Sequence, residues 1–83
     1  GDWQRALALL QRMRDAGVKP NDAVFGKVIA CLGFSGQAPA AVCQWRDMVA
    51  EGVAPSPRTL HVTLAAAASG GLWREADEVI AEM

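Results

Sequence analysis

A trio of glycine, alanine and methionine returns along this chain at a constant interval of 35 residues. The three copies are Gly1, Ala6 and Met13, then Gly36, Ala41 and Met48, then Gly71, Ala76 and Met83. A catalytic site needs its residues once and in one place, whereas a pattern that returns at a fixed period indicates one structural unit used repeatedly. The sequence therefore predicts a stack of similar units that offers a surface.

Each unit carries the signature of a helix that ends at a glycine. An apolar residue recurs every three or four positions between residues 3 and 13, which predicts one buried helical face. Gly17 and then Pro20 follow this run, and Gly52 and Pro55 repeat that order. A glycine that adopts a left-handed conformation, followed by a proline that cannot continue the helix, is typical of a helix C-terminus.

A second amphipathic run follows in each unit. Asn21 or Asp22 caps its start, and in the next copy Ser56 provides a capping hydroxyl before a proline at the first helical position. The sequence thus predicts five helices and no strand, with helices at about 2–16, 22–34, 38–50, 58–69 and 72–83. Short turns make neighbouring helices antiparallel, so the expected all-α fold is an α-solenoid of stacked hairpins.

The repeated trio has a physical role in this fold. The glycines are expected to let the chain turn sharply between helices, and the alanines to be small where two helices cross closely. The methionines are expected to fill irregular space at the far end of each hairpin. The three tryptophans, Trp3, Trp45 and Trp73, are expected to pack between helices.

Composition excludes several classes of protein. The 83 residues carry 8 Lys and Arg against 9 Asp and Glu, so the overall charge does not attract a polyanion. No uninterrupted apolar run approaches the ~20 residues that a membrane span requires, so no membrane partner is expected. Cys31, Cys43 and the single histidine lack the number and spacing of a zinc site or a disulfide framework, and we expect neither a metal nor a cofactor.

Catalytic residues are not expected either. The stretch Gly33-Phe34-Ser35-Gly36 is superficially similar to a nucleophile elbow, but Gln37 occupies the place of the final glycine. No strand precedes it, and His61 has no partner evident in the sequence. The chain is therefore predicted not to be an enzyme.

The unit ends in Met, three residues, Gly-Val, one residue and Pro, at Met13–Asn21 and again at Met48–Ser56. This 35-residue hairpin resembles the pentatricopeptide repeat. Further matches are an aromatic residue that opens the first helix, a Val-Ile pair and a Ser-Gly turn, at Phe25, Val28-Ile29 and Ser35-Gly36. The tetratricopeptide repeat, a peptide-binding hairpin, remains an alternative, although its period is 34 residues.

In this register the chain holds parts of three repeats. Residues 1–21 are the second helix of one repeat, residues 22–56 form a complete repeat, and residues 57–83 form part of a third. Neither end has the polar capping face that a free solenoid requires. We therefore expect the chain to be a piece of a longer array.

The resemblance implies a single-stranded RNA binder of the mitochondrion or chloroplast, acting in RNA stabilisation, processing or translation. The family's base-reading positions, near the start of the first helix and at the end of the repeat, fall on Asn21, Gly26, Ser56 and His61. The positions that flank the base fall on Ala23 and Arg58.

Charge placement also favours this face for a phosphate. Residues 22–35 and 57–70, the expected inner surface, hold Lys27 and Arg58 against one acid, whereas the rest holds more acids than bases. Base choice is expected to be lax, because Gly26 has no side chain and Ser56 uses its hydroxyl as a cap. Phe34 stands where the family often has a phosphate-binding lysine. Stacking on a base is one possible use of its ring, but we expect it to be buried against the next repeat.

These weak reading positions leave a second interpretation open. The repeats are then a scaffold within an organellar ribosome or another large assembly, where they contact ribosomal RNA or other proteins by shape.

Overall fold

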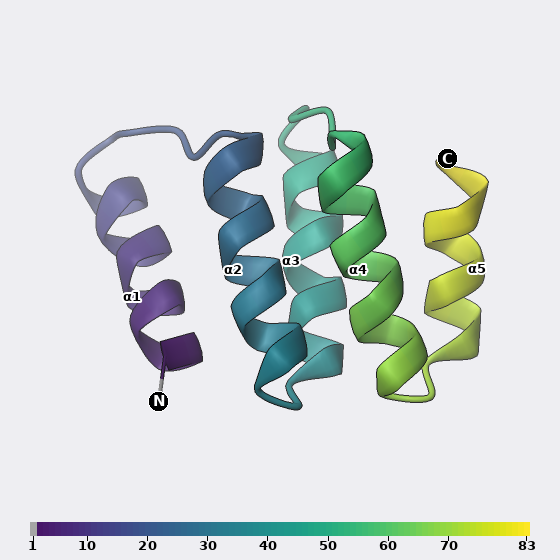
Figure 1. Ribbon diagram of the computed structural model, residues 1–83. Coiled ribbons are helices and arrows are strands. Elements are labelled where there is room, and N and C mark those ends of the chain that lie inside the picture. Colours follow the sequence, from purple (N-terminus) through teal and green to yellow (C-terminus); the bar gives the residue numbers. More distant parts are fainter. Residues whose placement is uncertain (1) are drawn as a thin grey trace.

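The computed structural model describes residues 2–83, and all five predicted helices are present in it (Figure 1). Their bounds are α1 Asp2–Asp15, α2 Asp22–Phe34, α3 Ala38–Ala50, α4 Pro57–Ser69 and α5 Trp73–Ala81. Residues 2–83 contain no strand, so the all-α prediction is confirmed. None of these helices is both long and apolar enough to cross a membrane.

The helices stack as antiparallel hairpins in two layers. In Figure 1, α2 and α4 lie side by side and run in the same direction, and α3 lies behind them. Each helix packs against the next one along the chain, and α2 also packs directly against α4. The first helices of successive repeats therefore form one continuous face, which we call the α2/α4 face.

Glycines end the helices where the repeat predicts them. Gly36 and Gly71 have φ angles of 74° and 72°, a region that other residues rarely adopt. After Gly36, the Gln37 N–H donates to the Leu32 carbonyl over 2.8 Å, and the equivalent bond after Gly71 has the same length. This pattern satisfies carbonyls that the helix leaves open and turns the chain into the next helix. Gly1 lies outside the described residues.

The core confirms most of the roles predicted for the repeated alanine and methionine. Ala41 and Ala76 are buried where helices cross, and the side chain of Met48 is fully enclosed. Met83 was expected to fill a similar space, but this prediction is wrong because 62% of its surface is exposed. Within residues 2–83, no helix follows α5 to cover it.

The tryptophans behave differently from one another. Trp45 is buried and Trp3 packs against the core, as predicted. Trp73 is 67% exposed, so its predicted packing role is wrong. At the equivalent position of α3 stands Ala38, which is buried against Gly70 at the end of α4, whereas no described helix covers the start of α5 in this way.

Ion pairs connect the second helices of successive repeats. Arg14 of α1 binds Glu51, which follows α3, and Arg46 of α3 binds Glu78 of α5 over 2.8 Å. The hydrogen bond from Arg46 to Glu78, together with the carboxylate's charge, raises the pKa of this arginine. Because the Arg46 pair is half exposed, solvent screens it and it orients the helices more than it stabilises them.

Candidate functional site

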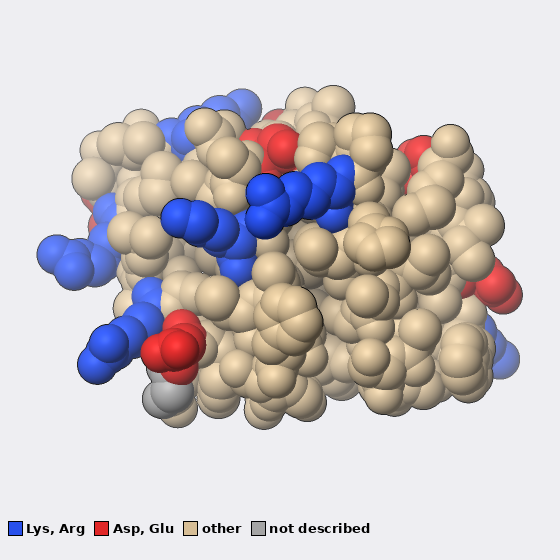
Figure 2. All heavy atoms as spheres, in the orientation of Figure 1, with Lys and Arg blue, Asp and Glu red and all other residues tan. Residues whose placement is uncertain are grey.

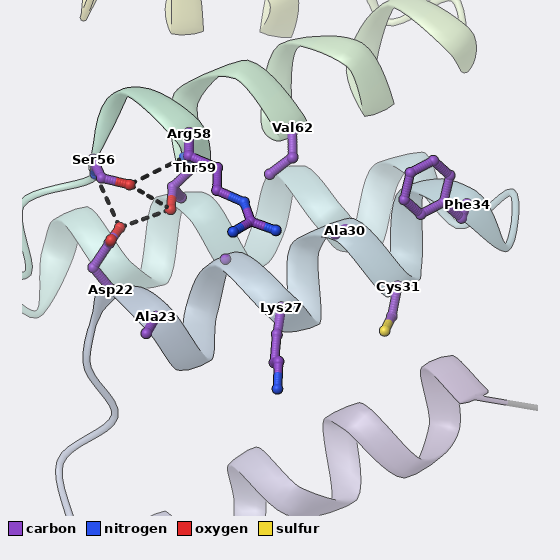
Figure 3. Close-up of a pocket in the computed structure, with 11 residues that line it drawn as sticks. Asp22, Ala23, Lys27, Ala30, Cys31, Phe34, Ser56, Arg58, Thr59 and Val62 are labelled. Carbon is purple, nitrogen blue, oxygen red and sulfur yellow. Dashed lines mark hydrogen bonds between the residues drawn. The ribbon is translucent and has the colours of Figure 1, made fainter.

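A groove of about 450 Å³ lies between α2 and the start of α4 (Figure 3). We call it the first groove. Five of the seven residues singled out in the sequence line it, namely Ala23, Gly26, Lys27, Ser56 and Arg58. The structure thus brings residues from two successive repeats to one site, because α2 and α4 run parallel with their N-termini at the same end.

The other two predicted residues lie elsewhere. His61 lines a second groove of about 300 Å³, farther along the same face. The two grooves share Ala30, Phe34 and Val62, so they are continuous. Asn21 lines neither groove, and its side-chain oxygen accepts a hydrogen bond of 3.0 Å from the Val24 N–H at the start of α2. Asn21 therefore acts as the helix cap predicted for this position.

The sequence did not reveal a hydrogen-bond network that joins α2 to α4. Asp22 Oδ1 accepts bonds from the Ser56 backbone N–H at 2.9 Å and from the Thr59 hydroxyl at 2.7 Å (Figure 3). The Ser56 hydroxyl accepts from the Thr59 N–H at 3.3 Å and lies 3.2 Å from the Thr59 hydroxyl oxygen, to which it donates. The Ser56 hydroxyl is therefore occupied in capping α4, as the sequence predicted.

The network also sets the charge of the Asp22 side chain. Partial burial by itself would raise the pKa of this carboxyl. The hydrogen bonds from Ser56 and Thr59 outweigh this effect, and the pKa of Asp22 lies below its ordinary value of 3.8. Asp22 is thus an anion whose Oδ1 atom is already engaged at one end of the first groove.

Packing explains why position 26 is a glycine. A Cβ atom at Gly26 would lie 2.9 Å from the Thr59 hydroxyl oxygen, closer than real Cβ atoms come. Seven residues on, a Cβ at Gly33 would lie 2.8 Å from the Ala66 Cβ. These two glycines face α4 and let it approach α2 closely. The absence of a side chain at Gly26 is therefore a consequence of how the repeats stack.

The positive charge on this face is concentrated at one end. Figure 2 shows Lys and Arg side chains crossing the upper part of the α2/α4 face, with an uncharged surface below them. Lys27 and Arg58 are both exposed and are the cations that line the first groove. In Figure 3, the Arg58 side chain reaches from α4 toward α2.

Phe34 departs from the sequence prediction. It was expected to be buried against the next repeat, but 90% of its surface is exposed. Successive residues of an α-helix point about 100° apart, and at the end of α2 it is Gly33 that faces α4. Phe34 therefore projects beside the contact and lines both grooves.

Neither cysteine is bonded to another residue through a disulfide. Cys31 lines the first groove and Cys43 is exposed. Within residues 2–83, no cluster of His, Cys, Asp and Glu has an arrangement that would hold a metal ion.

The hairpins, their glycine turns and their shared face define an α-helical repeat protein. No protein-family model matches the chain. A pentatricopeptide repeat-containing protein of Arabidopsis thaliana is 30% identical over 78 residues, which are 94% of this chain. The chain spans about a tenth of the length of that relative. Fold and similarity together make it a pentatricopeptide-like helical repeat.

Proposed function

We propose that the α2/α4 face binds single-stranded RNA noncovalently, and that the chain serves in an organellar protein that stabilises, processes or translates RNA. The observation that carries this proposal is the first groove itself. Residues that the resemblance assigns to RNA contact come from two repeats and line one continuous depression. A surface that runs across parallel helices suits a ligand that is itself a linear repeat.

Electrostatics supports a phosphate backbone as the ligand. Lys27 and Arg58 are exposed, and within residues 2–83 neither of them forms a salt bridge with an acid. Asp22 is the acid that lines the first groove, and its Oδ1 is held by Ser56 and Thr59. Two cations against one engaged carboxylate give the first groove a net positive charge, which attracts a polyanion and releases its counterions.

A scaffold role within an organellar ribosome or another large assembly is the second candidate. One observation favours it, because Gly26 has no side chain and the Ser56 hydroxyl is engaged with Thr59. A face with no free group at these positions makes contact by shape and charge, with structured RNA or with a protein.

Salt-dependent binding tests the proposal. The chain is titrated into a labelled single-stranded RNA at increasing salt, and fluorescence anisotropy gives the dissociation constant. Two phosphate contacts predict that the association constant, which is the reciprocal of this dissociation constant, falls as salt rises. The logarithm of the association constant should fall against the logarithm of the salt concentration with a slope of about −1.4. Lys27→Glu with Arg58→Glu should abolish binding, whereas Lys19→Glu with Arg74→Glu makes the same charge change outside the first groove and should retain most of it.

Three results distinguish the interpretations. Loss of binding in the groove variant alone supports the RNA interpretation. The absence of binding to any single strand contradicts it and favours the scaffold. Saturable binding of a peptide, with indifference to RNA, favours a module of tetratricopeptide type.

A further inference from the structure

Phe34 is an exposed aromatic side chain that borders an apolar depression. The second groove beside it is lined on the α4 side by three small residues together with one valine and one exposed histidine, namely Ala65, Ala66, Ser69, Val62 and His61. Small residues opposite an exposed ring leave a flat space in which another planar group can lie against the ring. The surface of Phe34 has no partner in residues 2–83, with 90% exposed.

The second groove continues into the charged one. Lys27 and Phe34 both line the first groove, and they lie seven residues apart on α2. Two helical turns separate them by about 10 Å along the axis. Arg58 and Val62 border the same path from α4. A ligand that spans both grooves therefore meets cations at one end and an aromatic ring with apolar walls at the other, which matches a strand of phosphates that carries planar bases.

The groups that would read a base edge in this repeat are engaged elsewhere. The Ser56 hydroxyl both donates to and accepts from Thr59, and the Thr59 hydroxyl donates to Asp22. Gly26 cannot be replaced by a larger residue without displacing this hydroxyl. Stacking on an aromatic ring, in contrast, tolerates every base because each base has a π-face.

We propose that Phe34, together with the small residues of α4, stacks one nucleobase of a single strand, and that the repeat 22–56 accepts all four bases there. This inference rests on the proposed RNA-binding function. It adds to that function an aromatic contact that carries affinity and a repeat that contributes no sequence preference.

The test compares an RNA strand with an abasic strand of the same length. Phe34→Ala should weaken binding of the base-bearing strand by about 5- to 150-fold and leave binding of the abasic strand unchanged. Phe34→Trp should retain binding of the base-bearing strand. Trp73→Ala removes an exposed aromatic outside both grooves and should leave binding of both strands unchanged. The NMR signals of the Phe34 ring should shift when the base-bearing strand is added.

Base tolerance is measured with homopolymers of the four nucleotides, which should bind within a few-fold of one another. A preference above about tenfold for one base, lost with Ser56→Ala, would overturn the claim that the repeat accepts all bases. Equal weakening for the abasic strand, or no weakening in Phe34→Ala, would overturn the stacking site.

The two proposals fail separately. If the chain binds RNA in a salt-dependent way and the Lys27 and Arg58 variant abolishes this, but Phe34→Ala binds as well as the natural chain, only the stacking site is wrong. If no single strand binds, both are wrong. Binding of an apolar peptide that depends on Phe34, without RNA binding, would assign the second groove to a protein partner.

Discussion

At Gly26, close packing against α4 favours a glycine, whereas the proposed base recognition would use a side chain. In Gly26→Ala the new Cβ would lie 2.9 Å from the Thr59 hydroxyl oxygen and would push it away from Asp22. We expect the free energy of unfolding to fall by about 1–3 kcal/mol, although alanine is the better helix former by about 1 kcal/mol. Urea denaturation measures this change.

The control is the same substitution in a Thr59→Ala background. The displaced hydroxyl is then absent, and the next atom of residue 59, its Cβ, lies at an ordinary contact distance of 4.0 Å. There Gly26→Ala should stabilise the chain by up to about 1 kcal/mol. If Gly26→Ala changed the free energy of unfolding in the same direction in both backgrounds, the proposed contact between α2 and α4 would be contradicted.

Asp22 predicts how stability responds to acid. Because hydrogen bonds lower its pKa in the folded state, its contribution is fully present above the ordinary value of 3.8 and is lost as pH falls through the lower folded pKa. Asp22→Asn should therefore flatten the decline of unfolding free energy below about pH 4. Thr59→Val, which keeps the Ser56 N–H bond, should flatten it less. If the free energy of unfolding declined with acid in Asp22→Asn as it does in the natural chain, the hydrogen bonds of Asp22 would not contribute to stability.

At the scale of helices, the sequence predicted the features that depend on residues close together in the chain. Apolar spacing and glycine-proline pairs placed α1 to α4 within a residue, because helix ends depend on nearby residues. Partners 34 to 37 residues apart, such as Asp22 with Ser56 and Thr59, were not predictable, since they arise only when repeats stack. The error at Phe34 has the same origin, because the direction from which α4 approaches decides which residue is buried.

The contact between α2 and α4 should be the least tolerant part of the stack. Ala66 is buried opposite Gly33, so in Ala66→Leu the added atoms have no space. We expect a loss of about 1–3 kcal/mol in unfolding free energy. Ala65→Leu places the same side chain at the neighbouring exposed position and should change stability by less than about 0.5 kcal/mol. Thermal unfolding followed by circular dichroism compares the two variants.

For the whole molecule, the repeat period allows the exposed side of α5 to be compared with the buried side of α3. Ile80 and Met83 are mostly exposed, whereas Trp45 and Met48, one repeat earlier, are buried. We propose that another hairpin covers this side of α5 in a longer array, in which residues 22–56 are one complete repeat between the partial repeats 1–21 and 57–83. Without that hairpin, α5 should show weaker amide hydrogen-exchange protection than α2, because α5 contributes two buried residues whereas α2 contributes four fully or almost fully buried apolar residues.

An uncovered apolar face also predicts association of the 83-residue chain with itself. Trp73→Glu with Ile80→Glu should shift sedimentation velocity profiles toward the monomer, while the unfolding midpoint stays nearly constant because both side chains are already exposed. Leu9→Glu with Val49→Glu introduces the same charges at exposed apolar positions of α1 and α3 and should leave association unchanged. In a helical repeat, each hairpin is stabilised by covering the one before it. The proposal of a neighbouring hairpin is contradicted if the chain stays monomeric at high concentration and its amide protection is uniform across α1 to α5.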